Sequence, residues 1–238
     1  MNNILLTAST SKIAQKLAIE LARKGYNLAL HYFNSETTAN ELLRKLSDLN
    51  IKAQLFKANA RHPSEIESTF RNIIDYFGEI NILINNIGVF PQKVNFTDIN
   101  LEQWNEVFDI NLRSAFLFSQ QFARQPLEKG TIINISSIGG LEHWKGSLLY
   151  NVSKSALIHL TKSLAVELAP RITVNCISPG IIKTADEPIP INSESIPLKK
   201  YGQVQDIFSA VCLFIENDYI TGQNIIVDGG YSLIRKSK

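Results

Sequence analysis

Short apolar runs alternate with longer amphipathic stretches along nearly the whole chain, and this alternation limits the possible folds to a few. Most apolar runs are continuous, which is typical of strands buried on both faces of a parallel sheet. We expect seven strands, at Ile4–Thr7, Asn27–Tyr32, Ala53–Lys57, Ile80–Asn85, Thr131–Ser136, Thr173–Ser178 and Asn224–Val227. We expect helices at Lys12–Lys24, Glu36–Leu49, Pro63–Phe77, Leu101–Arg124, Leu148–Leu168 and Val204–Glu216. This order predicts an α/β fold, a Rossmann-type doubly wound parallel sheet of about seven strands with helices on both faces.

The chain shows no internal repeat and no break in composition, so we expect one domain over residues 1–238. A formal charge of +2 gives no reason to expect nucleic acid or a membrane as partner. Cys176 and Cys212 lie in apolar stretches and suit a reducing compartment. No basic leader with a cleavage site and no apolar run of about 20 residues is present, so we expect a soluble cytoplasmic protein.

Residues 184–200 depart from this pattern, because they are rich in Pro, Ser and acidic residues and lack periodicity. In open α/β sheets the ligand lies beyond the carboxyl ends of the strands. The segment follows a late strand, so we expect it to close over the ligand as a substrate lid. A surface loop without function is the alternative.

Tyr150 and Lys154 lie four residues apart on a strong helical pattern, and therefore on one face. A phenol with a pKa of about 10 is a poor proton donor at neutral pH, and a neighbouring ammonium lowers that pKa. The pair alone is weak evidence, since Tyr and Lys meet at this spacing on many helices. Other residues give the pair context. Ser136 and Ser137 lie at the end of one predicted strand, and Asn85 and Asn86 with Gly88 lie at the end of another. Asn111 is a polar residue within an otherwise apolar helical stretch.

Together these residues resemble the short-chain dehydrogenase/reductase family over essentially the whole chain. The family's Asn-Asn-Ala-Gly is matched by Asn85 to Gly88, its Tyr-x-x-x-Lys by Tyr150 to Lys154, and its helix asparagine by Asn111. Its catalytic serine, thirteen positions before the tyrosine, selects Ser137. Further matches are Pro179-Gly180, Thr221-Gly222 and Asp228-Gly229-Gly230.

The resemblance implies an NAD(P)H-dependent carbonyl reductase. Tyr150 would donate a proton to the substrate carbonyl, and Lys154 would lower the Tyr150 pKa and hold the nicotinamide ribose. Ser137 would hydrogen-bond the carbonyl oxygen, and Asn111 would hold a water linking Lys154 to solvent. Phe90, Ser137, Trp144 and Tyr150 would contact the substrate. The expected cofactor-binding residues are Thr7, Ser9, Ser11, Lys12, Ile13, Tyr32, Asn34, Ser35, Asn59, Ala60, Asn86, Ile87, Gly88, Tyr150, Lys154, Pro179, Gly180, Ile182 and Thr184.

The expected nucleotide loop, TASTSKIA at residues 7–14, contains no glycine. Ala8, Lys12 and Ala14 stand where the family pattern has its three glycines, which give a tight turn, close approach of the pyrophosphate and helix packing. A position that needs a glycine-only conformation would be strained by about 1–3 kcal/mol, which weakens cofactor binding. Lys12 at a helix N-terminus could compensate by contacting a phosphate.

The end of the second predicted strand, His31 to Ser35, carries no acid that would bind a ribose 2′-hydroxyl. Lys12, Asn34 and Ser35 could bind a 2′-phosphate, so we expect NADP(H) to be preferred over NAD(H).

Two substrate classes remain open. A 3-oxoacyl-(acyl carrier protein) reductase-like activity is the first expectation. Pteridine reductases resemble the chain at Lys12, at residues 30–42 and at Phe90, although Asn34 replaces their usual arginine. A catalytically weak binding or scaffold protein is an alternative of another class. The family implies a homotetramer, and the four histidines show no metal-ligand spacing, so we expect no metal.

Overall fold

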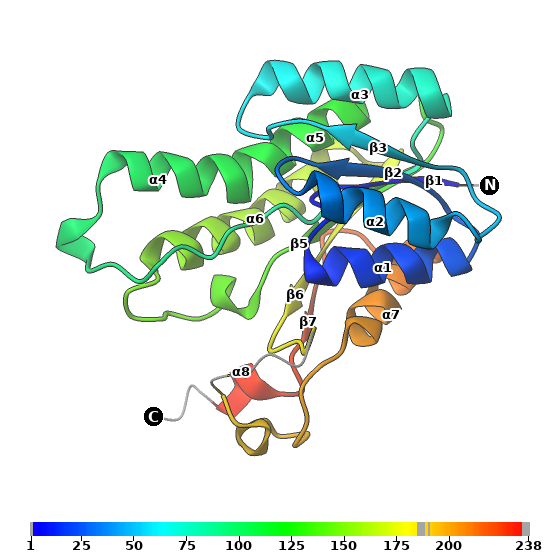
Figure 1. Cartoon of the computed structure of the whole chain (residues 1–238). Coiled ribbons are helices and arrows are strands. Elements are labelled where there is room, and N and C mark those ends of the chain that lie inside the picture. Colours follow the sequence, from blue (N-terminus) through cyan, green and yellow to red (C-terminus); the bar gives the residue numbers. More distant parts are fainter. Residues whose placement is uncertain (1, 185–188, 190, 235–238) are drawn as a thin grey trace.

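The computed structural model describes residues 2–184, 189 and 191–234 of the 238-residue chain. Seven parallel strands form one sheet in the order β3-β2-β1-β4-β5-β6-β7 (Figure 1). The strands are β1 Asn3–Leu6, β2 Asn27–Tyr32, β3 Ala53–Lys57, β4 Ile82–Asn85, β5 Gly130–Ile135, β6 Ile172–Pro179 and β7 Asn224–Val227. The order reverses between β1 and β4, as in doubly wound sheets. The predicted α/β class, strand number and parallel topology are confirmed.

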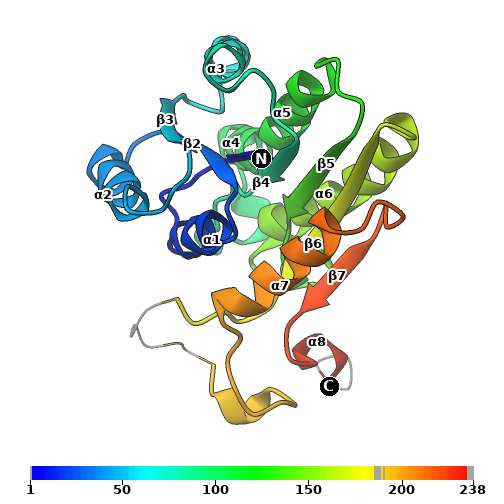
Figure 2. The same cartoon turned by 90° about the vertical axis from the view of Figure 1, so that its right-hand side faces the viewer.

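Helices cover both faces of the sheet (Figure 2). They are α1 Lys12–Arg23, α2 Glu36–Leu46, α3 Pro63–Phe77, α4 Leu101–Phe108, α5 Ser114–Ala123, α6 Leu148–Glu167, α7 Val204–Ile215 and α8 Tyr231–Ile234. Helices α1, α2 and α7 pack on one face, and α3, α5 and α6 pack on the other. The central strands are therefore buried from both sides, which accounts for their continuous apolar sequences.

The stretch predicted as one helix, Leu101–Arg124, is divided into three parts. Between α4 and α5 the backbone forms a π-helical turn at Asp109–Arg113. A π-helical turn inserts an extra residue into a helix and often occurs at functional sites. The sequence does not reveal this turn, because Ile110 and Leu112 continue the apolar helical stretch on both sides of Asn111. The inserted turn carries Asn111, which is fully buried.

The expected lid at 184–200 falls partly outside the described residues, namely at 185–188 and 190. A short 3₁₀ turn, Ser193–Ser195, lies in the described part. Ile196, which follows it, is buried and packs with Ile138 and Tyr231. The Tyr201 hydroxyl donates a hydrogen bond to the Ile191 carbonyl at 2.7 Å. This part of the segment is therefore anchored against the C-terminal end of the described chain.

Among the helices that the structure describes, none combines the length and the apolar character required to span a bilayer.

Candidate active site

Because all seven strands are parallel, their carboxyl ends lie along one edge of the sheet, and the segments that follow them meet there. The residues expected to bind cofactor and substrate come from these segments. After β1 come Thr7, Ser9, Ser11, Lys12 and Ile13; after β3 come Asn59 and Ala60; after β4 come Asn86, Ile87, Gly88 and Phe90; and after β5 come Ser137 and Trp144. Tyr32 ends β2 and is followed by Asn34 and Ser35, and Pro179 ends β6 and is followed by Gly180, Ile182 and Thr184. Tyr150 and Lys154 lie in α6, and Asn111 lies in the π-helical turn.

The glycine-free turn between β1 and α1 keeps a glycine-like backbone. Ala8 has φ = +49°, in the left-handed region that side chains other than glycine rarely adopt. The expectation of strain at the first glycine position is therefore met at Ala8. Ala14, at the third glycine position, is fully buried among the residues packed between α1 and the sheet.

The turn is fastened to β4 by Asn86. The Asn86 amide nitrogen Nδ2 donates to the carbonyls of Thr7 and Ala8, at 3.2 and 3.3 Å, and to the Ser11 hydroxyl at 3.1 Å. The Asn86 backbone N–H donates to the Thr7 hydroxyl at 2.9 Å. Ser11 also caps α1 by accepting from the Ala14 N–H. Asn86 thus holds the turn, in addition to any contact it makes with a ligand.

The same turn is fastened to β2 by His31, a residue that the sequence reasoning did not select for the site. The Ala8 N–H donates to His31 Nδ1 at 3.2 Å, and the Ser9 N–H donates to the His31 carbonyl at 2.8 Å. His31 is 2 % exposed. The signal in the sequence was a histidine within an otherwise apolar strand, but only the fold brings it beside the turn.

A nicotinamide nucleotide fits this edge on three observations. The first turn of α1 supplies a helix N-terminus, where backbone N–H groups attract phosphate, and Lys12 begins that helix with an exposed side chain. The Ser9 hydroxyl is fully buried in the turn and has no hydrogen-bond partner. Gly88, in the segment after β4, leaves space that a side chain would fill, and a Cβ there would lie 3.0 Å from Lys154 Nζ.

The end of β2 is open and uncharged. Asn34 and Ser35 are exposed, and the first acid, Glu36, begins α2. The Glu36 carboxylate is paired with Lys57 at 3.0 Å. The positions expected to contact a ribose 2′-substituent therefore carry Asn34 and Ser35, and the carboxylate that follows them is already paired.

Two adjacent serines at the end of β5 have different surroundings. The Ser136 hydroxyl donates to the Lys154 carbonyl at 2.9 Å and ties β5 to α6. The Ser137 hydroxyl accepts from the Gly139 N–H at 3.1 Å, so its own proton remains available for another acceptor. Of the two serines, Ser137 is the one that acts on Tyr150, where it lowers the pKa of the phenol. It is also the serine that the family spacing selects.

Lys154 is buried at 4 % exposure, and its Nζ donates to the Ile135 carbonyl at 3.1 Å. Burial lowers the pKa of Lys154 from its usual 10.5 to about 8. The group therefore carries its charge at neutral pH, but at a considerable desolvation cost.

The pKa of Tyr150 differs from the sequence-based expectation. Burial of the phenol raises its pKa above 10, and the hydrogen bond with Ser137 acts in the opposite direction. The Lys154 ammonium was expected to lower this pKa, but burial of the phenol has the largest effect and raises it. The reason is that the oxygen of a phenolate loses more hydration in this setting than the neutral phenol does.

Asn111 has its hydrogen bonds satisfied by protein. Its Oδ1 accepts from the Val89 N–H at 2.8 Å, and its Nδ2 donates to the Val89 carbonyl at 3.1 Å and to the Ser153 hydroxyl at 3.0 Å. Ser153, one residue before Lys154, is a second residue that the sequence reasoning missed. Asn111 therefore joins the segment after β4 to α6.

Aromatic rings surround Tyr150. The Phe90 ring, 56 % exposed, lies edge-on to Tyr150 with centroids 4.6 Å apart. Trp144 is nearly parallel to Tyr150, with centroids 6.1 Å apart, and its indole N–H donates to Glu142. Phe90 and Trp144, both expected to contact substrate, thus flank the tyrosine.

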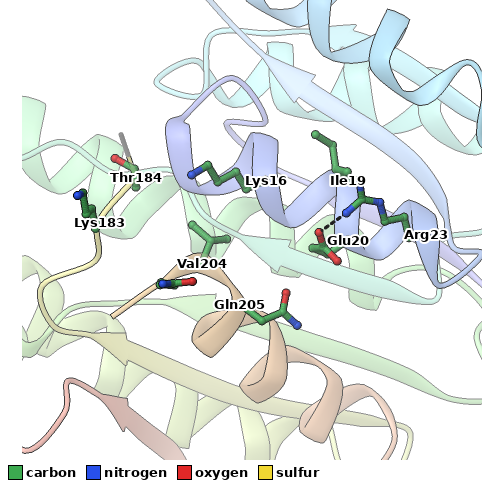
Figure 3. Close-up of a pocket in the computed structure, with 9 residues that line it drawn as sticks. Lys16, Ile19, Glu20, Arg23, Lys183, Thr184, Val204 and Gln205 are labelled. Atoms are coloured by element: carbon green, nitrogen blue, oxygen red, sulfur yellow. Dashed lines mark hydrogen bonds and ion pairs between the residues drawn. The ribbon is translucent and has the colours of Figure 1, made fainter. Parts of the chain in front are cut away.

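A separate groove of about 570 Å³ lies between α1 and α7 (Figure 3). Lys16 and the Glu20–Arg23 ion pair line it from α1, and Thr184 lines it from the segment after β6. It includes none of the four catalytic candidates, so its size does not make it the reaction site. Within the described part of the chain, no cluster of three or more His, Cys, Asp or Glu side chains is arranged to hold a metal ion.

Comparison with known proteins agrees with this geometry. The family described as Enoyl-(Acyl carrier protein) reductase matches residues 7–232. The 3-oxoacyl-[acyl-carrier-protein] reductase FabG of Staphylococcus epidermidis is 33 % identical, over 95 % of this chain and 97 % of that protein.

Solved structures agree as well. A short-chain dehydrogenase/reductase from Serratia marcescens superposes with a TM-score of 0.91 at 28 % identity, over 97 % of this chain and 98 % of that one. A blue fluorescent protein from a metagenomic library, solved in complex with NADPH, gives a TM-score of 0.89 at 28 % identity over the same shares. On its sheet order, its motifs and these full-length matches, the chain belongs to the short-chain dehydrogenase/reductase family of NAD(P)-dependent oxidoreductases.

Proposed function

We propose that the protein is an NADPH-dependent reductase of a 3-oxoacyl thioester, with residues 1–238 acting as one catalytic domain. The observation that carries the proposal is the buried Lys154 ammonium, which lies one helical turn from Tyr150 and beside Gly88. A buried charge is costly, and a structural lysine gains nothing from it. A charge beside a tyrosine that must give up a proton is useful for catalysis.

In this mechanism Tyr150 donates its proton to the substrate carbonyl oxygen. Ser137 is oriented by the Gly139 N–H so that its own hydroxyl donates to the same oxygen, where negative charge develops. Lys154 would stabilise the phenolate that remains and would hold the nicotinamide ribose of the bound nucleotide. The bound nucleotide supplies the hydride. The remaining proposed cofactor contacts are those named above at the ends of β1 to β4 and after β6.

Preference for NADPH follows from charge at the end of β2. Asn34 and Ser35 do not repel a 2′-phosphate, the Glu36 carboxylate is occupied by Lys57, and Lys12 adds a positive charge nearby in sequence to the phosphate-binding turn. Two free buried cysteines, Cys176 and Cys212, suit a reducing compartment such as the cytoplasm.

The oxoacyl substrate is favoured by the full-length likeness to 3-oxoacyl-[acyl-carrier-protein] reductases. The test is turnover of an acetoacetyl thioester with NADPH by wild type and by Tyr150→Phe. Removing the general acid should lower turnover by about a hundredfold or more. The Phe variant keeps the ring and its contacts with Phe90 and Trp144, so an unchanged rate would exclude Tyr150 as the acid.

A pterin is a second candidate substrate, and the aromatic surroundings of Tyr150 favour it. Phe90 and Trp144 offer ring faces and edges on which a flat heterocycle can stack. Phe90→Leu separates the two candidates, since it should weaken binding of a pterin far more than binding of a short thioester.

We also propose that the protein assembles through α5 and α6, as a dimer of dimers. A groove of about 500 Å³ between these helices is lined by Phe108, Leu112, Phe116 and Leu160, among others. Phe116 is 41 % exposed in the single chain. Large apolar surface of this kind is commonly covered by a partner subunit.

A further inference from the structure

Ala8 poses a structural problem that the cofactor turn has to solve. Its φ of +49° is a conformation in which the Cβ of an L-residue is crowded by its own backbone. Glycine would avoid this crowding. With alanine, the free turn favours other conformations, and interactions elsewhere must hold the observed one.

Both backbone polar groups of Ala8 are held by side chains from other strands. The N–H donates to His31 Nδ1 at 3.2 Å, and the carbonyl accepts from Asn86 Nδ2 at 3.3 Å. Asn86 belongs to the family's Asn-Asn motif. His31 belongs to no motif of the site described above.

The neighbours of His31 fix its protonation state. Nδ1 faces a backbone N–H, so it must be the unprotonated acceptor. Nε2 faces the Ala58 carbonyl at 3.1 Å, so it must carry the proton. The ring also lies against Phe118, edge to face at 5.1 Å. Burial lowers the pKa of His31 to about 4, so the neutral form is present at physiological pH.

We propose that His31 is a positioning residue for nucleotide binding: its neutral ring, protonated at Nε2, accepts the Ala8 N–H and so keeps the glycine-free turn in its binding shape. The side chain itself touches no cofactor. The inference rests on the proposed nucleotide site, and it explains how that site functions with Ala8 in place of glycine.

A pair of amide variants separates the two hydrogen bonds of the ring. In His31→Asn the side-chain oxygen lies near the position of Nδ1 and can accept from Ala8, but the side chain is too short to reach Ala58. In His31→Gln the side-chain amide lies near the position of Nε2 and can donate to the Ala58 carbonyl. It has no acceptor atom near the position of Nδ1, so the Ala8 N–H is left without a partner. Phe118→Leu is the packing control, since it removes buried contact from the same ring and leaves the Ala8 bond intact.

The readout is the NADPH dissociation constant, measured by fluorescence alongside the midpoint of thermal unfolding. We expect His31→Gln to bind NADPH about tenfold more weakly than wild type, because the partly buried Ala8 N–H loses its acceptor and the turn loses its support. His31→Asn and Phe118→Leu should stay within about twofold to threefold of wild type despite lowered unfolding midpoints. Equal affinity in wild type and His31→Gln would overturn the proposal. Equal losses in all three variants would also overturn it, because they would indicate packing alone.

A rescue experiment tests the connection to Ala8. Ala8→Gly in the His31→Gln background should recover most of the lost affinity, since glycine adopts the turn without support. No recovery would contradict the proposal. If the Gln variant does not fold, the ¹⁵N shifts of His31 in wild type decide, because protonation at Nδ1 instead of Nε2 would exclude the Ala8 bond. A wild type that binds no nucleotide would instead refute the proposed function.

Discussion

Lys154 is the most costly ionised side chain in the proposed site. Burial lowers its pKa from 10.5 to about 8, which corresponds to a cost of the order of 3 kcal/mol for holding the charge at neutral pH. Its hydrogen bond to the Ile135 carbonyl offsets part of this cost. Under the proposed mechanism, the site sacrifices stability for a charge one helical turn from Tyr150, a trade-off common in active sites.

Lys154→Met tests this trade-off. The variant should lose turnover by about a hundredfold or more and yet gain about 2 kcal/mol in free energy of unfolding near neutral pH, because no charge is buried. Between pH 8 and 10.5 the unfolded wild-type chain binds a proton that the folded chain does not. Wild type therefore becomes more stable as pH rises, and the difference in free energy of unfolding between it and Lys154→Met becomes smaller. Urea unfolding at several pH values measures both effects. Lys162→Met, which replaces an exposed lysine of α6, is the control. A Lys154→Met variant less stable than wild type would contradict the claim that the buried Lys154 charge lowers stability.

The free energy of unfolding also depends on pH through His31, on the acidic side of neutral pH. Its pKa is about 4 in the folded chain against 6.5 in an unfolded one. As pH falls from 6.5 to 4, the unfolded chain takes up a proton that the folded chain refuses, so about 3 kcal/mol of stability is lost. His31→Asn should lack this loss, whereas His143→Asn, which replaces an exposed histidine between β5 and α6 and outside the groove along α5 and α6, should keep it. If the free energy of unfolding of wild type and of His31→Asn fell in parallel between pH 6.5 and 4, His31 would not be the source of this loss.

The π-helical turn between α4 and α5 connects secondary structure to the site. It directs Asn111 inward, where three hydrogen bonds join Val89 to Ser153. The segment after β4, with Gly88 and Phe90, is therefore positioned from a helix on one face of the sheet. Its geometry depends on the turn as much as on β4 itself.

Asn111→Leu should release this segment. We expect amide hydrogen exchange at Val89 to rise by about tenfold or more, since its N–H loses a buried acceptor, and stability to fall by about 2 kcal/mol. Asn105→Leu makes the same change at an exposed position of α4, away from these hydrogen bonds. It should alter neither the hydrogen exchange at Val89 nor the free energy of unfolding. Unchanged protection at Val89 would show that Asn111 does not hold the segment.

The elements differ in how well the sequence predicts them. Continuous apolar runs such as Asn27–Tyr32 predicted the strands to within a residue or two, because burial on both faces leaves a strong pattern. The π-helical turn was missed because Ile110 and Leu112 continue the apolar stretch on both sides of Asn111. Tyr150, Lys154 and Ser137 were predicted from their spacing together with the family resemblance, while His31 and Ser153 act through contacts made only after distant segments meet. The sign of the Tyr150 pKa shift likewise depends on burial that no local pattern reports.

The assembled protein depends on the groove along α5 and α6. If it is a subunit interface, a charge placed in it should prevent assembly. Phe116→Glu should convert the wild-type oligomer to smaller species in light scattering coupled to size-exclusion chromatography. Leu213→Glu, on α7 at a position that is 43 % exposed, places the same charge on the other face and should leave the oligomer intact. Dissociation by both variants, or by neither, would argue against this interface.

The architecture as a whole is that of a nucleotide-binding sheet whose phosphate turn lacks glycine but is supported from β2 and β4. Whether this support suffices is decided by a fluorescence titration of the wild-type protein with NADPH, with NADH alongside. We expect NADPH to saturate the wild-type protein at about micromolar concentrations and NADH to bind more weakly. Absence of binding by either nucleotide up to about 1 mM would mean that the turn cannot hold a cofactor, and the proposed reductase activity would fall with it.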